Sequence, residues 1–178
     1  MKKIFLFLFL FVCLLHGYTY DDLLLRAQSS IFPKIMILDK KIVNKVINGK
    51  IIYTIVYAND DYQKALDIKK NINRSFKGYI GTYAYKVNLI EFSKLSNAIQ
   101  TSAFYVLKSS KENIYKVANI ARKKGVLTFS YDINNLKNGL AFSLVIERST
   151  LLYLNEKHID ITKIDFIDSL LQMIKFIE

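Results

Sequence analysis

Three consecutive strand signals within residues 123–155 constrain the fold more than any other part of the sequence. Residues 126–129 are a short apolar run directly after Gly125, which is typical of a buried strand in a parallel sheet. Two β-rich runs follow at residues 140–146 and 150–154, and only three residues separate them. A connection of this length is typical of a hairpin. We therefore expect a sheet that turns antiparallel at one edge.

Upstream of these signals, apolar runs alternate with helix starts. Residues 103–107 are another buried strand, and the next helix begins with the spacing of a capping box, Ser109 three residues before Glu112. Gly125 then ends that helix as a glycine C-cap. A strand, a capped helix, a glycine and a strand make a βαβ unit. The sequence therefore predicts an α/β fold, a three-layer sandwich with a mostly parallel sheet and an antiparallel C-terminal hairpin at one edge.

The other periodic segments predict the elements that cover and extend this sheet. Apolar spacing at Leu24, Ala27 and Ile31 predicts a first helix, which Pro33 should stop. We also expect a short helix over 42–47, ended by Asn48-Gly49, and a strand over 51–57. A helix from Asn59, with Tyr62 on its buried face, and a strand over 79–87 should follow. The remaining predicted elements are a short helix within 90–99 and a last helix from Thr162 onward.

The first 17 residues have the layout of a secretory signal peptide. Two lysines precede an almost wholly apolar run over residues 4–15, and Gly17 comes before a polar segment. The run is shorter than the ~20 residues that a transmembrane helix needs. We therefore expect residues 1–17 to be removed on export, residues 18–178 to form a single domain, and the mature protein to be periplasmic. An uncleaved signal anchor and a lipoprotein modified at Cys13 stay open as alternatives.

Export limits the chemistry of the chain. Removal of the signal takes away Cys13, the only cysteine, and one of the two histidines. Disulfides, zinc sites of cysteine and histidine ligands, and cysteine nucleophiles are thereby excluded within the mature chain. We expect the remaining histidine, His158, to be a surface or capping residue.

Motifs of the common enzyme classes are absent from the predicted mature chain. It lacks GxGxxG, GxxxxGK[ST], HExxH, GxSxG and SxxK. The carboxylate pairs Asp60-Asp61 and Asp165 with Asp168 fit helix-start charges and an exposed face better than an acid/base dyad. The sequence therefore favours a protein that is not an enzyme and has no cofactor or metal.

The formal net charge is +11 at pH 7, which is usual for proteins that bind nucleic acid or anionic membranes. Export argues against nucleic acid, although Lys77-Gly78-Tyr79 and the GxxG pattern over 78–81 resemble fragments of RNA-binding motifs. Two explanations of the charge stay open. One is an A+T-rich coding sequence, which favours Ile, Asn, Lys, Tyr and Phe, and the other is electrostatic steering towards a membrane-anchored partner.

Polar residues follow three of the predicted strands, at the positions where open α/β sheets bind ligands. They are Asn59, Asp60, Ser109, Ser110, Ser130, Tyr131 and Asp132. Two interpretations stay open. These residues can be the ordinary caps and turns of an α/β domain, or they can form a small polar pocket or a rim on which a partner docks.

Three tyrosines give a second candidate surface. Tyr79, Tyr83 and Tyr85 lie in one predicted strand with partial alternation. Tyrosine is enriched at protein interfaces. We expect either an ordinary strand with tyrosines facing solvent or a protein-binding surface.

The last third of the sequence resembles a known family. Residues 125–128 (GVLT), 130–132, Asn138-Gly139, Asn155 and Leu170-Leu171 are similar in identity and order to the C-terminal half of the YfiR-like periplasmic family. The resemblance implies an α/β sandwich that binds the periplasmic part of an inner-membrane diguanylate cyclase and holds it inactive. The implied partners are a membrane-anchored signalling protein and a second copy of the chain, and no contact residues carry over.

Functions of two other classes stay open beside this one. One is a catalyst of unfamiliar type, whose turnover would be abolished by changing Asp60 or Asp132, and the other is a binding protein. A solute-binding component of a transport or sensory system would use the same strand-end loops. Such a protein should show a thermal shift with a small polar ligand.

Overall fold

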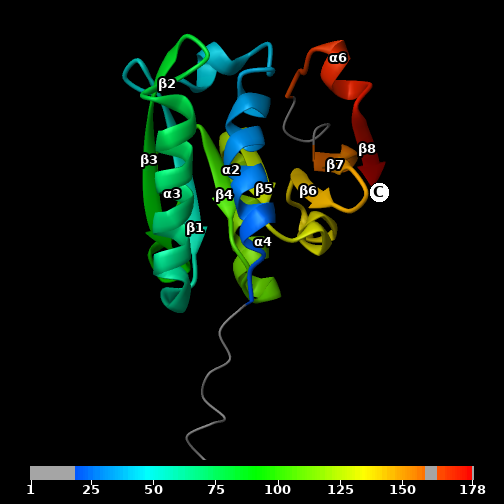
Figure 1. Ribbon diagram of the computed structural model, residues 1–178. Coiled ribbons are helices and arrows are strands. Elements are labelled where there is room, and N and C mark those ends of the chain that lie inside the picture. The colour runs from blue at the N-terminus through cyan, green and yellow to red at the C-terminus, as the bar shows by residue number, and fades with distance from the viewer. Residues whose placement is uncertain (1–18, 159–163, 178) are drawn as a thin grey trace, which may run out of the picture.

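The computed structural model describes residues 19–158 and 164–177, which form one eight-stranded sheet with helices on both faces (Figure 1). In their order across the sheet, the strands are β2 (Tyr79–Ile80), β3 (Tyr83–Glu91), β1 (Lys50–Tyr57), β4 (Ala103–Val106), β5 (Leu127–Ser130), β6 (Phe142–Ile146), β7 (Thr150–Asn155) and β8 (Ile174–Ile177). The main helices are α2 (Asp22–Met36), α3 (Tyr62–Phe76), α4 (Lys111–Lys124) and the short α6 (Asp168–Leu171). Short 3₁₀ helices lie at Ile42–Lys45, Asn59–Asp61, Phe92–Lys94 and Ile133–Asn138.

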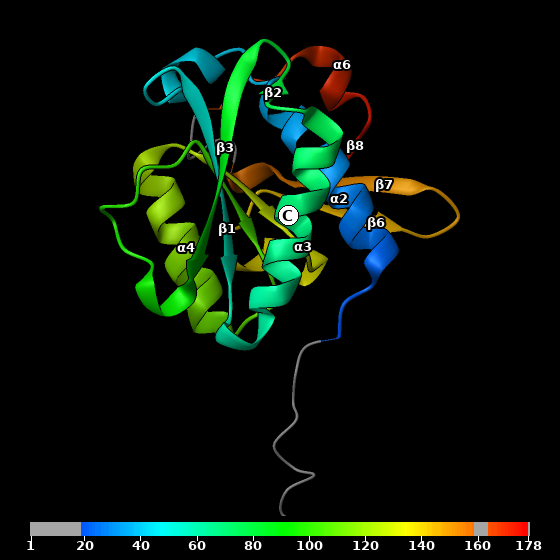
Figure 2. The ribbon, with the colours of Figure 1, turned by 60° about the vertical axis from the view of Figure 1, so that its left-hand side comes forward.

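The central strands β3, β1, β4, β5 and β6 run parallel. β2 is antiparallel to β3, and β7 forms an antiparallel hairpin with β6 in which Phe142 lies opposite Leu154. Helices α2 and α3 cover one face of the sheet and α4 covers the other (Figure 2). The predicted three-layer sandwich, with its mostly parallel sheet and C-terminal hairpin, is confirmed. The strand β8 lies parallel to β7 on its outer side, so the hairpin is one strand in from the edge.

The prediction of a last helix is wrong for its described part. Residues 164–177 contain only the single turn α6 before β8. Ile174 is buried, whereas Lys175 and Phe176 are exposed. The apolar spacing fits a helix locally, but β7 would otherwise have unpaired backbone groups on its outer side, and β8 satisfies them.

Helix α2 continues through Pro33, which was predicted to stop it. Proline removes one backbone hydrogen bond and crowds the carbonyl group four residues earlier. Pro33 itself is buried, and the residues around it, Phe32, Ile35 and Met36, belong to the core on this face of the sheet. Burial of this last turn offsets the cost of the proline, since tertiary packing supplies most helix stability.

The segment before β1 also differs from its prediction. Only the 3₁₀ helix Ile42–Lys45 forms there. Asn48 and Gly49 both have positive φ, 49° and 74°, and they connect Ile47 to Lys50 in a tight turn with mutual backbone hydrogen bonds. Asn-Gly is the preferred pair for such a turn because both central residues need positive φ. The pair starts a strand and does not cap a helix.

The tyrosine-rich segment forms two strands in place of the single predicted one. Gly81, with a φ of 60°, lies in the turn between β2 and β3, and β3 then runs to Glu91. The short helix expected within 90–99 is reduced to the 3₁₀ turn Phe92–Lys94. The predicted β1, β4, β5, α3 and α4 are confirmed, but Tyr62 on α3 is 51% exposed and not buried.

Two apolar clusters fill the space on the two faces of the sheet. Under α2, Phe129 stacks between Phe32 and Phe142, with ring centroids 4.8 and 5.6 Å away. Under α4, Phe104 and Val106 pack with Val117 and Ala121. Each large apolar side chain buried in this way contributes roughly 1.5–3 kcal/mol. This packing fixes the ends of β1, β4 and β5, where the candidate site lies.

Within residues 19–158 and 164–177, no helix has both the length and the apolar character needed to cross a membrane. The predicted signal peptide, residues 1–17, lies outside the described residues.

Candidate functional site

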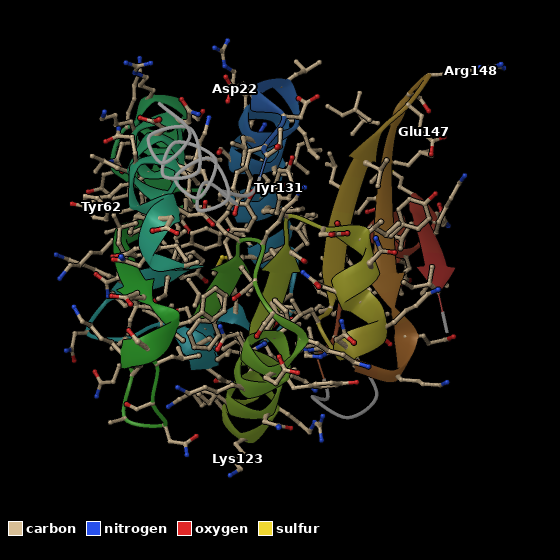
Figure 3. The ribbon with its side chains drawn as sticks, turned by 90° about the horizontal axis from the view of Figure 1, so that it is seen from below. Asp22, Tyr62, Lys123, Tyr131, Glu147 and Arg148 are labelled. Carbon is tan, nitrogen blue, oxygen red and sulfur yellow. The ribbon has the colours of Figure 1, made fainter. Side chains whose placement is uncertain are left out.

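The carboxyl ends of β1, β4 and β5 meet at one end of the sheet, the lower end in Figure 1, where α3 and α4 begin. The start of the described chain, Thr19 to Asp21, lies at the same end because α2 begins there. Figure 3 looks onto this end and shows Tyr131 between α2 and the central strands, with Tyr62 to one side at the start of α3. Three loops and the N-terminal segment thus come together here.

Tyr20 joins these loops through its hydroxyl group. Its Oη donates to Asp61 Oδ2 at 2.6 Å, after β1, and accepts from the backbone N of Lys108 at 3.1 Å, after β4. Its ring packs edge-on against Tyr131, after β5, with centroids 4.8 Å apart. We call Tyr20, Asp61, Lys108 and Tyr131 the strand-end cluster.

Lys108 covers the outer side of this cluster. Its Nζ lies 5.6 Å from the ring centroid of Tyr20 and 5.2 Å from that of Tyr131, within the range of cation–π attraction. The same Nζ donates to the carbonyl oxygen of Thr19 at 2.7 Å. The backbone N of Asp21 donates to Tyr131 Oη at 2.8 Å. The chain's own N-terminal segment therefore fills the place where ligands enter related open sheets.

Burial changes the acidity of the cluster. It raises the pKa of Tyr20 far above its usual value, and the neighbouring Asp61 raises it further. Burial also raises the pKa of Asp61, against the lowering effect of the Tyr20 hydrogen bond. Burial also raises the pKa of Tyr131. Both tyrosines stay protonated at neutral pH and act as hydrogen-bonding groups, which suits binding better than nucleophilic chemistry.

A buried hydrogen-bond network lies on the inner side of the cluster. Tyr105 Oη donates to Gln28 Oε1, and Gln28 Nε2 donates to the carbonyl oxygens of Tyr131 and Leu144 at 3.2 and 3.1 Å. Gln28 and Tyr105 have no exposed surface. The side chain of Gln28 therefore ties α2 to the end of β5 and to β6.

Most of the predicted strand-end residues make local hydrogen bonds. Ser110 Oγ accepts from the backbone N of Asn113 and is the N-cap of α4, one residue later than the cap predicted at Ser109. Ser109 Oγ instead accepts from Asn113 Nδ2 at 2.8 Å. Asp132 Oδ1 accepts from the backbone N of Asn134 at 2.9 Å, and Ser130 Oγ donates to the carbonyl oxygen of Asp132. These four residues serve as caps and turns.

The remaining predicted residues divide between the cluster and the surface. Tyr131 lies inside the cluster, whereas Asn59 and Asp60 are exposed in the 3₁₀ turn after β1. Asp61, and not its neighbour Asp60, points into the cluster. Tyr20, Asp61 and Lys108 were not predicted as site residues from the sequence. Lys108 had a usable signal because it follows a predicted strand, but nothing local in the sequence marks Tyr20.

The second candidate surface is only partly exposed. Tyr79 on β2 is 61% exposed, while Tyr83 and Tyr85 are half-buried and pack against the core under α2 and α3. Tyr85 Oη donates to Asn73 Oδ1 of α3 at 3.1 Å. Tyr62 is an exposed tyrosine at the strand ends that was not predicted as such. Its ring centroid lies 5.7 Å from that of Tyr57.

The predicted surface position of His158 is wrong. Its side chain is buried, and Nδ1 lies 2.8 Å from the carbonyl oxygen of Gly139. Burial lowers the pKa of this imidazole. The histidine therefore links Gly139, in the turn before β6, to the segment after β7. Among the described residues, no group of three or more His, Cys, Asp or Glu side chains could hold a metal ion.

Grooves lined by charged side chains lie elsewhere on the molecule. One, of about 260 Å³, lies between α2 and α3, and its lining combines basic side chains such as Arg26 and Arg74 with the carboxylates of Asp22 and Asp67. Two further cavities, of about 540 and 410 Å³, adjoin along β3, since both are lined by Lys69, Lys86 and Val87.

Comparison with protein-family models and with curated proteins found no match. Solved structures share the fold. A conserved domain protein from Vibrio cholerae O1 biovar El Tor aligns with a TM-score of 0.62 at 10% identity, over 86% of this chain and 60% of that one. The ABC domain from Streptococcus pneumoniae, in complex with L-Trp, aligns with a TM-score of 0.52 at 10% identity, over 81% and 60% of the two chains. This chain therefore spans less than two thirds of either protein.

Proposed function

We propose that this is an exported, non-enzymatic regulatory protein. It docks through its strand-end surface on the periplasmic part of a membrane-anchored signalling protein of the diguanylate-cyclase type and modulates it. The observation that carries the proposal is the closed strand end. Tyr20 occupies the position of a ligand, so this end offers a surface of tyrosine and lysine side chains.

The composition of this surface supports docking. Tyr62 is exposed beside the cluster, and Lys108 lies over its two tyrosine rings. Tyrosines are enriched at protein interfaces because they combine a large apolar ring with a polar tip. The formal net charge is +11 for the full sequence and +9 without Lys2 and Lys3, and it would speed the encounter with an acidic partner or with a partner at an anionic membrane.

The sequence supports the location and the class of partner. The signal-like segment over residues 1–17 favours export, and residues 125–132, 138–139 and 170–171 resemble the YfiR-like periplasmic family. Proteins of that family restrain a diguanylate cyclase of the inner membrane, often as dimers. A second copy of the chain is therefore part of the proposal.

A deletion and a pull-down test this function together. Loss of the gene should raise cyclic di-GMP, and the mature protein should recover a membrane cyclase from solubilised membranes. Unchanged nucleotide levels with an empty pull-down would reject the proposal.

Matched variants locate the docking surface. Tyr62→Ala and Lys108→Ala should each weaken recovery of the cyclase. Tyr79→Ala should not, because Tyr79, which is even more exposed than Tyr62, lies on β2 at the other end of the sheet. Loss of recovery with Tyr79→Ala alone would move the interface to β2 and contradict docking at the strand end.

One observation favours a second candidate, a solute-binding component of a transport or sensory system. The Streptococcus structure with the same fold was solved with L-Trp bound. Under this alternative, the N-terminal segment would leave the strand end when a small polar ligand binds. A rise in melting temperature with L-Trp or another amino acid, abolished by Tyr131→Ala, would favour solute binding over docking.

A further inference from the structure

The outer side of β3 is open along most of its length. β2 pairs only with Tyr83 and Ala84, and no strand within the described residues lies beside the rest of β3. Figure 1 shows β3 at the margin of the sheet, with the short β2 at its upper end and α3 in front of it. An open edge can accept an additional strand, because its backbone groups point outward.

The direction of these backbone groups follows from one hydrogen bond. The backbone N of Tyr85 donates to the carbonyl oxygen of Gly78 at 3.4 Å, so Tyr85 directs its backbone groups away from β1. Backbone groups alternate in direction along a strand. All of these residues lie in register with β1. By this alternation, Val87, Leu89 and Glu91 direct their N–H and C=O groups outward, whereas Lys86, Asn88 and Ile90 direct theirs toward β1.

A basic groove follows this edge. The adjoining cavities of about 540 and 410 Å³ extend along β3 from Gly78 to Ile90, and their lining includes Lys69 of α3 as well as Ile99, which packs on the opposite face of the sheet. Three lysines line them, Lys69, Lys77 and Lys86, and no acidic side chain does. Within the described part of the chain, none of the three takes part in an ion pair with a carboxylate. We call this feature the β3 groove.

The lysines lie on both sides of the edge. Val87 packs under α3, so by alternation Lys86 points to the opposite face of the sheet. Lys69 belongs to α3 and lies on the same side as Val87. An added strand would therefore meet positive charge on both of its faces.

The positive charge of the β3 groove determines what kind of strand can bind there. A second copy of the chain, paired edge to edge, would bring the same lysines together, and like charges directly opposite are destabilising. Lysine at an open edge is also a common device against pairing between copies. A segment with carboxylates on both faces would satisfy the backbone and the lysines together.

We propose that the β3 groove binds an extended acidic segment of a partner protein, which adds to the sheet as a strand beside β3. Backbone hydrogen bonds to Val87 and Leu89 supply the pairing, and Lys69 and Lys86 select the charge. This site is distinct from the strand-end surface and goes beyond the proposed docking there.

The probe is a fluorescein-labelled peptide, Thr-Glu-Val-Glu-Glu-Val-Glu-Thr, with a control peptide in which lysine replaces each glutamate. Fluorescence anisotropy with the mature protein should show saturable binding of the acidic peptide and none of the basic one. Lys86→Glu and Lys69→Glu should each weaken binding on the order of tenfold. Lys123→Glu, on the exposed end of α4, changes the net charge equally and should have little effect.

Hydrogen exchange separates strand addition from simple charge attraction. Saturation with the acidic peptide should slow exchange of the Val87 and Leu89 amides at least tenfold, measured by NMR, because those N–H groups become paired. Binding without this protection, equal weakening by Lys123→Glu, or no binding at all would each overturn the proposal. Lys108→Ala lies outside the groove, so it should keep peptide binding while it weakens recovery of the cyclase, which separates failure of this inference from failure of the proposed function.

Discussion

Tyr105 and Tyr53 are neighbouring tyrosines without exposed surface, but only one hydroxyl group is used. Tyr105 Oη donates to Gln28 Oε1, whereas Tyr53 Oη has no hydrogen-bond partner within the described residues. Tyr105→Phe should lower the free energy of unfolding by about 1–3 kcal/mol, because it leaves the buried Gln28 oxygen without its donor. Tyr53→Phe should leave it unchanged or raise it. Urea unfolding measures both, and equal losses would contradict the assigned roles.

Asp61 gives the strand-end cluster a dependence on pH. Burial raises the pKa of Asp61 in the folded protein, so ionisation works against folding once the pH exceeds the unfolded pKa of about 3.9. Asp61→Asn keeps an acceptor for Tyr20 but cannot ionise. Relative to the native protein, this variant should gain stability as the pH rises from about 3.5 to 7, measured by melting temperature.

The exposed neighbour of Asp61 supplies the control. Asp60→Asn removes the same charge from a side chain outside the cluster. Its stability relative to the native protein should change less over the same pH range. If the two variants respond alike, the burial of Asp61 is not the cause of the pH dependence.

At the scale of residues, the sequence predicted the place of the site better than its members. Tyr131 was predicted because it follows a strand, and Ser110 and Asp132 turned out to be a cap and a turn residue. Tyr20 could not be predicted, because its partner Asp61 is 41 residues away and only the packing of α2 brings them together. A contact of this kind has no local signature in the sequence.

Two glycines in left-handed backbone test how the elements are joined. Gly139, after the 3₁₀ helix before β6, has a φ of 92°, and a Cβ there would lie 3.3 Å from Ala118 Cβ of α4. Gly78, between α3 and β2, has a φ of 95° with open space around it. Each change to alanine should cost roughly 1–2 kcal/mol for the backbone conformation. Gly139→Ala should cost more because of the added contact.

The comparison of these two variants isolates the contact with α4, since the backbone strain is similar in both. Chemical unfolding provides the measurement. Equal losses would mean that α4 shifts away from the new methyl group at no cost.

At the scale of elements, prediction succeeded where the signals were local. The cap at Ser110 and the left-handed Gly125 bound α4 on both sides, and both are visible in the sequence within one residue. The helix predicted over residues 164–177 was wrong because its apolar spacing suits a helix, whereas the strand β8 forms there by pairing with the open side of β7. The stop predicted at Pro33 was wrong for a related reason, since burial of Phe32 and Met36 overrides the local preference of proline. Packing with distant segments decided each error.

The whole molecule is built on one continuous sheet, and its larger core cluster includes side chains from Ile51 on β1 to Ile174 on β8. We therefore expect the mature protein to unfold in urea in a single transition, with coincident curves from far-ultraviolet circular dichroism and tyrosine fluorescence. Two separated transitions would mean that β6 to β8 form a lobe of their own.

Phe142→Ala sharpens this test, because the Phe142 ring on β6 packs against two parts of the molecule. Its ring centroid lies 5.6 Å from that of Phe129, in the centre of the sheet, and 5.4 Å from that of Phe166, before α6. Loss of this buried ring should cost about 3–5 kcal/mol. In a single cooperative unit, both probes should shift to lower urea together, because the strand-end cluster and the C-terminal strands depend on the same core. A shift confined to one probe would show that the hairpin can unfold while the central strands remain, and docking at the strand end would then not depend on the C-terminal strands.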